Sequence, residues 1–443
     1  MLISHFLRRT IALIFLMLTV YWPALANPTA QQAHNRRRLV GYYTQWSLYK
    51  RQFFVKDIAL ADPDRALTHL LYAFGNIRNN RCEVGVTEAT NTSTGAGGDA
   101  FADYVKPFNG QQTIDGQADS KTQPLRGNWN QLRKLKAQRP GLKILISLGG
   151  WSWSGGFASA AQPNNRREFV RSCIQAYIQG NLPQIDGAGG QAAALGVFDG
   201  IDIDWEYPGF CTLTCGSPAD RANYTALLKE FRQQLDAIRP GLLLTTAVGA
   251  GIDKIERTDP DQYARYVDFI NVMTYDFHGS RDKRTNHHSP LFASPDDPST
   301  GVEQFYNSHD AILAFLRQAV PPHKLNLGIG FYGHGWTHVA DMNHGLYQPG
   351  TGIKTASYKD LKQKTAPLFF DPQTGGLWSY DGNDFWSYDN PLSIRAKMDY
   401  VRAFGLGGAF FWEMSQDNQG ELLHAIKTGL DRSNRYEGAP SPI

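Results

Sequence analysis

Residues 199 to 208 read Asp199-Gly-Ile-Asp202-Ile-Asp204-Trp-Glu206-Tyr-Pro208, an alternation of acidic and apolar side chains. In a β-strand successive side chains point to opposite faces, so Asp202, Asp204 and Glu206 share one face. The isoleucines and the tryptophan between them share the other face. This pattern predicts a barrel strand whose apolar side packs against helices while its acids point into the lumen. Asp199 has the opposite parity, and we interpret it as a structural support.

Three carboxylates on one strand face indicate acid catalysis. Same-face residues are only about 6.6–7 Å apart along a strand, so all three cannot ionise cheaply and at least one pKa must rise. A raised carboxyl pKa is what a general acid near neutral pH requires. Glu206 is nearest the C-terminal end and thus nearest to substrate. A metal site would need further oxygen ligands after Pro208, and an acidic strand on a solvated edge would not alternate with isoleucine and tryptophan.

Short β-branched or aromatic runs recur along the chain, and amphipathic stretches separate most of them. The alternation predicts an α/β fold, a closed (β/α)8 TIM barrel, with an open doubly wound sheet as the alternative. No GxGxxG run follows an early strand, so a nucleotide site has little support. The predicted strands are Leu39–Trp46, Leu67–Ile77, Leu142–Gly150, Phe198–Tyr207, Leu242–Gly251, Val267–Phe277, Leu325–Trp336 and Gly405–Met414. The predicted helices include Trp129–Gln138, Arg166–Gln179, Ala219–Ile238, Val302–Ala319 and Leu392–Phe404.

Two connections are too long to be plain loops. Residues 78–127 form an extended excursion after the second strand. Residues 337–388 follow the seventh strand and predict an α+β insertion subdomain, with β-like pieces at Gly345–Tyr347 and Gly376–Tyr380 and a helical piece at Tyr358–Lys364. The barrel then comprises residues 38–336 and 389–432. Both excursions leave the C-terminal ends of strands, where barrel active sites lie, so we expect them to wall a groove.

The N-terminus predicts export. Arg8 and Arg9 precede an apolar run from residue 11 to 20, and Ala24 and Ala26 give an A-x-A cleavage site, so residues 1–26 are interpreted as a signal peptide. An uncleaved anchor is the alternative. We expect a secreted protein, extracellular or periplasmic, with no membrane association after cleavage and with disulfides permitted.

Composition narrows the function classes. The 443 residues carry 44 Lys plus Arg against 41 Asp plus Glu, a net charge of +3 that argues against a nucleic-acid binder. Aromatic residues make up 12%, which suits a groove lined with flat rings that bind sugars.

The four cysteines leave their pairing open. Cys211 and Cys215 lie in a short loop flanked by Gly and Pro, where a bridge would rigidify the turn without being required by the spacing. Cys173 lies on the apolar face of a predicted helix, so we expect a buried thiol there rather than a bridge to Cys82.

The acidic run resembles the DxxDxDxE signature of family 18 glycoside hydrolases, the chitinase family. Further motifs agree in order, and together the likeness spans about residues 40 to 426: Ser147-Leu-Gly-Gly-Trp151, Met273-Thr-Tyr-Asp276 and Phe410-Phe-Trp412-Glu. The predicted insertion is similar to the α+β subdomain of deep-groove bacterial chitinases.

The resemblance implies a substrate-assisted, retaining mechanism. Glu206 would protonate the glycosidic oxygen, and the sugar's N-acetyl carbonyl would attack its own anomeric carbon to give an oxazolinium ion. Asp204 would orient the acetamido N–H and share a proton with Asp202, and Tyr275 would hold the acetamido oxygen. The resemblance implies neither a metal nor an organic cofactor.

Further residues are expected to contact the sugar. By resemblance, Trp412 forms the floor under the reacting sugar, with a buried core tryptophan as the alternative, and Met273 and Asp276 lie near the sugar, although Met273 suits the core equally well. Trp151 follows Gly149 and Gly150, whose lack of side chains lets substrate approach the backbone, so we interpret it as a sugar platform. The remaining candidates end strands: Tyr332, Trp46 and Phe74, of which the last two suit the core equally well.

One departure from the family pattern is a histidine. The family often reads Tyr-Gly-Arg after the seventh strand, whereas this chain has Tyr332-Gly333-His334, and an imidazole cannot reproduce a permanently charged planar guanidinium. His287 and His288 lie in a polar segment, and we expect them to be solvated.

The leading hypothesis is a secreted chitinase that binds chitin or chitooligosaccharides and needs no more than a monomer. An endo-β-N-acetylglucosaminidase acting on N-glycans is the enzymatic alternative. A chitin-binding lectin on the same barrel is the non-catalytic one, although such lectins typically lose the glutamate that is present here as Glu206.

Overall fold

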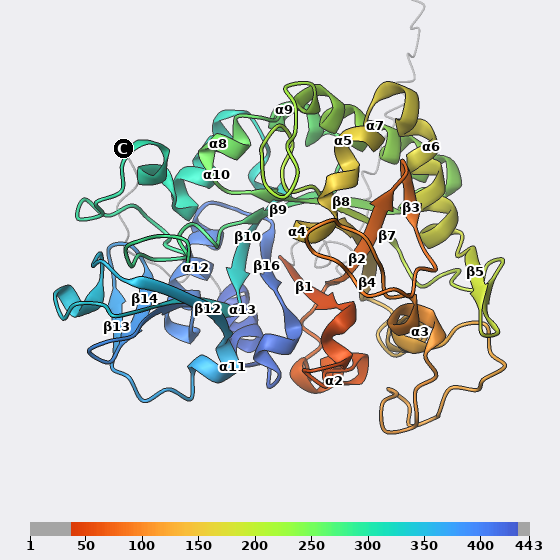
Figure 1. The fold of residues 1–443 in the computed structure, drawn as a ribbon, viewed down its shortest axis with the longest axis horizontal. Helices are drawn as coiled ribbons and strands as arrows, with labels where there is room; N and C mark the ends of the chain where they lie inside the picture. The colour runs from red at the N-terminus through yellow and green to blue at the C-terminus, as the bar shows by residue number, and fades with distance from the viewer. Residues whose placement is uncertain (1–36, 433–443) are drawn as a thin grey trace, which may run out of the picture. The chain divides into compact units, whose positions relative to one another are not determined.

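Parallel strands close into a barrel at the centre of residues 37–432, the part of the chain that the computed structural model describes (Figure 1). In hydrogen-bonding order the eight strands are β1 (Arg38–Thr44), β16 (Gly408–Trp412), β10 (Leu325–Gly330), β9 (Phe269–Met273), β8 (Leu243–Gly249), β7 (Gly200–Asp204), β4 (Lys143–Gly149) and β2 (His69–Arg78). Pairing of β1 with β2 closes the ring. The predicted TIM-barrel fold is thereby confirmed, while the proposed signal peptide lies outside the described residues.

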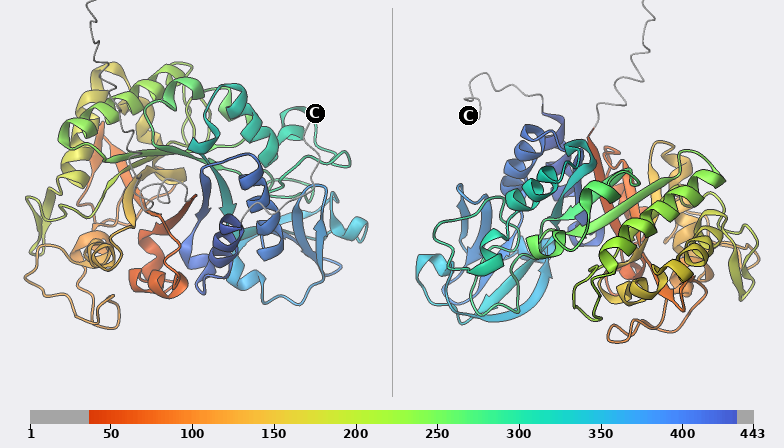
Figure 2. Two further views of the ribbon diagram at one scale, coloured as in Figure 1. Left: turned by 180° about the vertical axis from the view of Figure 1, so that it is seen from behind. Right: turned by 90° about the horizontal axis from the view of Figure 1, so that it is seen from above.

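Helices surround the barrel (Figure 2). The longer ones are α2 (Val55–Ala61), α3 (Gly127–Gln138), α6 (Pro163–Cys173), α7 (Asp220–Ile238), α10 (Ser308–Arg317), α12 (Pro391–Ala403) and α13 (Glu421–Asp431). Short ones are α4 (Gly150–Trp153), α5 (Phe157–Ala160), α8 (Ile252–Ile255), α9 (Pro260–Tyr263) and α11 (Tyr358–Leu361). No helix in residues 37–432 combines the length and the apolar character needed to cross a membrane.

Side-chain caps and backbone geometry explain where the observed helices depart from prediction. The helix expected from Val302 is interrupted, because the side chain of Asn307 accepts a hydrogen bond from the backbone N–H of Asp310 and starts α10 one residue later. The preceding turn, η5 (Gly301–Phe305), is a 3₁₀ helix. The helix expected to reach Gln179 continues beyond α6 as a π-helix, η4 (Ile174–Ile178).

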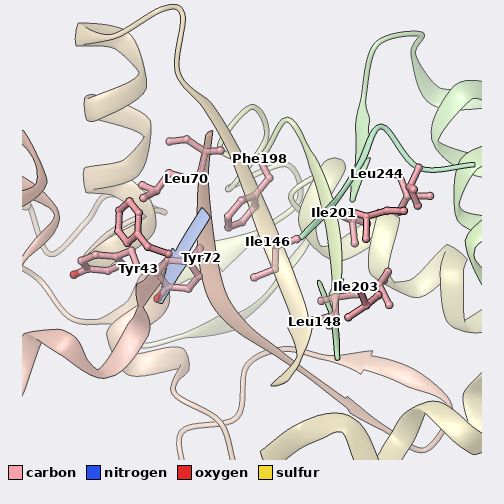
Figure 3. Packing of buried hydrophobic residues seen from close by; sticks show 14 of the residues in the cluster. Tyr43, Leu70, Tyr72, Ile146, Leu148, Phe198, Ile201, Ile203 and Leu244 are labelled. Carbon is pink, nitrogen blue, oxygen red and sulfur yellow. The ribbon is translucent and has the colours of Figure 1, made fainter. Parts of the chain in front are cut away.

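Two apolar layers position the acidic strand. In the outer layer, Ile201 and Ile203 of β7 lie beside Ile146 and Leu148 of β4, facing the helices (Figure 3). The inner layer fills the barrel lumen with Val40, Tyr42, Leu71, Leu145, Phe269 and Phe410. It continues toward the C-terminal ends of the strands, where Met273, Tyr275 and Tyr332 belong to the same cluster. Residues of opposite parity along β7 thus face different layers, as the alternation predicts.

A five-stranded antiparallel sheet follows β10 and lies beside the barrel at the lower left of Figure 1. Its strands, in spatial order, are β12 (Thr351–Ser357), β11 (Tyr332–Thr337), β15 (Phe385–Tyr388), β14 (Gly376–Tyr380) and β13 (Leu368–Asp371). The single strand predicted over Leu325–Trp336 is therefore wrong. It divides at Phe331, whose ring stacks on Phe411 at 4.1 Å while the chain turns into β11.

The sheet has an aromatic core of its own, which includes Trp336, Trp378 and Phe385. The predicted strand at Gly376–Tyr380 is present as β14, and the predicted helical piece is present as α11. The predicted strand at Gly345–Tyr347 is wrong. His344 and Tyr347 have φ angles of 50° and 62°, so the backbone turns there instead of extending.

Both cysteine pairs form disulfides. The expectation of a free Cys173 is wrong, because β3 (Arg81–Glu83) pairs with β2 and packs against α6, bringing Cys82 and Cys173 to a Cα separation of 4.9 Å. The backbone N–H of Cys82 also donates to the hydroxyl of Ser172. Cys211 and Cys215 are joined within their loop.

A second small hairpin, β5 (Leu182–Ile185) with β6 (Ala188–Gly190), precedes β7.

Candidate active site

A groove of about 1520 Å³ opens at the C-terminal ends of the barrel strands. It brings together all the residues predicted for the site except Asp202, which lies deeper. Those that line it are Glu206, Asp204, Tyr275, Trp412, Trp151, Met273, Asp276, Tyr332, Trp46 and Phe74. They come from the ends of seven different barrel strands, so the groove exists only in the folded barrel.

Asp202 is held rigidly beneath the groove. Its carboxylate accepts hydrogen bonds from the hydroxyls of Tyr42 at 2.9 Å, Ser147 at 2.8 Å and Thr245 at 2.5 Å. Burial raises the pKa of Asp202, while these three hydrogen bonds work to lower it. Tyr42 and Thr245 were not predicted, because they lie on β1 and β8 and carry no local motif.

Asp204 presents an unused acceptor to the groove. Its Oδ1 atom is buried and makes no hydrogen bond within residues 37–432. The pKa of Asp204 lies well above its ordinary value, because the carboxyl is buried and because Glu206 and Asp202 are nearby negative charges. A buried acceptor without a partner is costly to keep, so this atom is poised for a donor that comes from a ligand.

Glu206 lies two residues beyond the end of β7, and its main chain is fixed from two sides. Its N–H donates to the hydroxyl of Ser154 at 2.8 Å, and its carbonyl accepts from Thr212 at 3.0 Å. Burial raises the pKa of Glu206 to about 7, against a hydrogen bond from Tyr207 and with support from the negative charge of Asp276. A carboxyl with this pKa can act as a general acid near neutral pH.

Glycines at the end of β4 allow close approach to these acids. Gly149 has a φ of 101°, and a Cβ there would lie 2.3 Å from the backbone oxygen of Asp204. At Gly150 a Cβ would lie 2.5 Å from the ring of Phe74. Any side chain at either position would therefore displace the acidic strand or the groove wall.

Asp276 forms a polar cluster at the side of the groove. Its Oδ1 accepts hydrogen bonds from the hydroxyl of Tyr332 and from Nε2 of His334, both at 2.7 Å. Partial desolvation of the half-exposed Asp276 carboxyl acts to raise its pKa, but the imidazoles of His288 and His334 outweigh this and lower that pKa. His334, which stands where the resembled family often has arginine, contacts Asp276 directly.

The expectation that His287 and His288 are solvated is wrong. Their exposed fractions are 1% and 0%, because their segment lies between the barrel and the five-stranded sheet. The backbone N–H of His288 donates to the hydroxyl of Ser387 on β15. Gly376 makes room for His287, since a Cβ there would lie 2.6 Å from the imidazole.

Aromatic rings line the floor and one end of the groove. Trp412 stacks on Phe74 at a centroid distance of 5.4 Å, and Trp46 lies 6.4 Å from Trp412. Trp46 and Trp151 expose 39% and 40% of their surface, which is unusual for tryptophan. The core interpretation of Trp46 and Phe74 is thus replaced by a position on the groove wall.

Several groove residues carried no signal in the sequence. Lys254 lies over the ring of Phe210 at 4.7 Å, and Arg281 lies over the ring of Trp151 at 5.8 Å. All four line the groove, and only Trp151 belongs to a recognised motif. The others come from connections of irregular length, whose positions only the folded chain defines.

Comparisons with known proteins agree with this geometry. Residues 38–417 match the family model described as glycosyl hydrolases family 18. Chitinase C of Streptomyces lividans is 39% identical over 383 residues, covering 85% of this chain and 57% of that protein, so the chain spans little more than half of this relative. The catalytic domain of psychrophilic chitinase B from Arthrobacter TAD20 superposes with a TM-score of 0.84 at 38% identity, covering 89% of this chain and 95% of that one. Ostrinia furnacalis Group IV chitinase in complex with allosamidin has a TM-score of 0.69 at 28% identity, covering 89% and 98%. The chain belongs to family 18 of the glycosyl hydrolases.

Proposed function

We propose that the protein hydrolyses β-1,4 bonds between N-acetylglucosamine units of chitin or chitooligosaccharides. The proposal rests on two neighbouring acids in the groove, one of which can donate a proton while the other can accept a hydrogen bond. Glu206 has a pKa of about 7, and beside it Asp204 offers a buried oxygen that has no partner in the described chain. An acetamido N–H and a glycosidic oxygen on one sugar would meet both requirements. The chitinase names of its relatives agree.

Hydrolysis would proceed in two steps with retained stereochemistry. Glu206 gives its proton to the glycosidic oxygen as that oxygen leaves the anomeric carbon. The carbonyl oxygen of the same sugar's acetamido group bonds to that carbon and closes an oxazolinium ring. Water then attacks the anomeric carbon, the Glu206 carboxylate takes its proton, and the ring opens.

The neighbours of Glu206 would stabilise the ring. Asp204 accepts the acetamido N–H and offsets the positive charge that grows on nitrogen. Tyr275, buried beside Tyr332 at a centroid distance of 6.1 Å, would donate to the acetamido oxygen. Asp202, fixed by its three hydroxyl partners, keeps Asp204 oriented and shares its proton. These contacts strengthen as charge develops, so they lower the barrier rather than only binding substrate.

The shape of the groove supports a polymeric substrate. Trp46, Phe74, Trp412 and Trp151 line it, and aromatic rings along a groove would stack on successive sugars. We further propose that residues 1–26 direct export, which would place the enzyme where insoluble chitin is found.

Hydrolysis of soluble chitooligosaccharides by the full chain tests the proposal. The wild type should release shorter oligomers, and Glu206→Gln should lower kcat by at least about 10²–10⁴-fold while retaining binding. Glu256→Gln, an exposed glutamate outside the groove, is the matched control and should keep full activity. Binding without cleavage by the wild type would indicate a lectin. Faster cleavage of a glycoprotein's N-glycan would indicate the endo-β-N-acetylglucosaminidase.

A further inference from the structure

Three side chains from separate segments converge beside the groove. Asp276 follows β9, His288 lies in the long connection to β10, and His334 lies on β11 of the five-stranded sheet. One ligand atom from each lies within 4.8 Å of the other two. Asp276 Oδ1 is 2.7 Å from Nε2 of His334 and 3.9 Å from Nδ1 of His288. Two imidazoles and one carboxylate form a donor set that suits zinc and its neighbours in the first transition row.

The ring of His288 packs against Tyr332 and His334 beside the Asp276 carboxylate. The side chain is fully buried, and neither ring nitrogen makes a hydrogen bond within residues 37–432. Nδ1 of His334 is likewise buried without a partner in that range. Buried polar atoms without partners are rare in folded proteins and call for a ligand or another explanation. Here the unpartnered Nδ1 of His288 lies 3.9 Å from Oδ1 of Asp276, which Nε2 of His334 also contacts.

The backbone around the three side chains is firmly held. Ser387 links two of them, since its hydroxyl accepts from the N–H of His288 at 3.0 Å and its backbone pairs with His334 across β11 and β15. On the other side of His334, a Cβ at Gly279 would lie 3.0 Å from the imidazole. Ligands mounted on a fixed frame lose little freedom when they bind an ion.

We propose that Asp276, His288 and His334 bind one divalent transition-metal ion of the zinc type, and that the ion inhibits hydrolysis. Ligand atoms around a tetrahedral zinc ion are about 3.3 Å apart. The Asp276–His334 pair would open slightly and the Asp276–His288 pair would close slightly to reach this spacing. Because Asp276 and His334 line the groove, the fourth coordination position would face it.

The inhibitory half of this inference rests on the proposed function, whereas the binding half does not. A bound ion would take the Asp276 oxygen that now accepts from Tyr332. It would also place positive charge beside the sugar, where the transition state itself gains positive charge. Both effects would slow hydrolysis without unfolding the protein.

Calorimetric titration of Zn²⁺ into the EDTA-treated, dialysed full chain tests the binding half. We expect one ion per chain, and Co²⁺ should give the visible absorption of a tetrahedral nitrogen and oxygen site. His288→Gln and His334→Gln, on different segments, should each weaken Zn²⁺ binding at least tenfold. His287→Gln is the matched control, since His287 is adjacent, equally buried and also without ring partners in residues 37–432. No stoichiometric binding by the wild type, or equal binding by His288→Gln, would overturn the site.

Hydrolysis rates with and without Zn²⁺ test the inhibitory half. The ratio is taken within each protein, so that a change in basal activity cancels. The wild type and His287→Gln should be inhibited at concentrations that fill the site, and His288→Gln should resist at least tenfold more Zn²⁺. Binding without inhibition would overturn the inhibitory half alone. Zn²⁺ binding by a chain that cleaves no chitooligosaccharide would leave the site intact and remove the proposed function.

Discussion

The pH dependence of hydrolysis should report the carboxyl of Glu206. Burial raises its pKa to about 7, and the negative charge of Asp276 adds to the rise. An ordinary glutamate with a pKa of about 4.3 would be protonated in only about one molecule in 500 at pH 7. At a pKa of about 7, half of the molecules hold the proton at pH 7. The protonated fraction of Glu206 is therefore about 250 times that of an ordinary glutamate. Activity should therefore persist up to neutral pH.

The assay is kcat/KM on a chromogenic chitobioside at substrate well below KM, from about pH 3 to pH 9. We expect an alkaline limb near pH 7, with a rate at pH 8 about tenfold below the plateau. Asp276→Asn should move this limb to lower pH, because a removed negative charge makes ionisation of Glu206 easier. Asp64→Asn, an exposed carboxylate outside the groove, should leave it in place.

Three outcomes would refute this reasoning. A limb near pH 4–5 would mean that burial does not hold the proton on Glu206. A flat profile to pH 9 would remove the carboxyl from the acid role. A shift to higher pH in Asp276→Asn would contradict the sign of the charge interaction. Asp204 and Glu206 interact, so the apparent pKa belongs to the pair of carboxyls. The pH profile of Glu206→Gln is therefore compared with that of the wild type, and the limb that the variant lacks is assigned to Glu206.

The remaining predictions concern positioning and stability. Asp204→Asn and Tyr275→Phe should each lower kcat more than they raise KM. The kcat of the double variant should be reduced by less than the product of the two single reductions, because both residues serve one step. Multiplicative losses would assign the two residues to different steps. Ser154→Ala should lower kcat about tenfold, since loss of one hydrogen bond of about 1–1.5 kcal/mol frees the main chain of Glu206; unchanged kcat would contradict this. Replacing Cys82 and Cys173 by alanine should lower the free energy of unfolding by about 4 kcal/mol, because the bridge spans 91 residues, and equal denaturation midpoints would show that the bridge contributes nothing.

The sequence allowed prediction of features that depend on local periodicity. The alternation along β7 places Asp204 toward the lumen and Ile203 toward the helices, because strand side chains repeat every two residues. The same argument predicted Glu206 at the strand's open end, although β7 ends at Asp204, three residues earlier than expected. The order of strands and helices predicted the barrel, and the pairing of β1 with β2 decides against the alternative of an open doubly wound sheet.

Contacts between distant segments could not be predicted in this way. The three hydroxyls on Asp202 come from separate strands, and nothing in the residues around Tyr42 or Thr245 distinguishes them from core positions. Cys82 meets Cys173 only because a three-residue strand folds back onto α6. His288 was expected in solvent because its neighbours are polar, yet the five-stranded sheet covers it.

Substrate assistance by the acetamido group is the central claim, and matched substrates test it most directly. Initial rates should be compared for two chromogenic chitobiosides that differ only at the reacting sugar, one with an N-acetyl group and one with a free amine. With the carbonyl nucleophile removed, we predict a kcat/KM at least about 10²-fold lower, as expected when an intramolecular nucleophile is lost. A thiazoline mimic of the ring intermediate should inhibit competitively in the same assay. Equal rates on the two substrates would contradict the account.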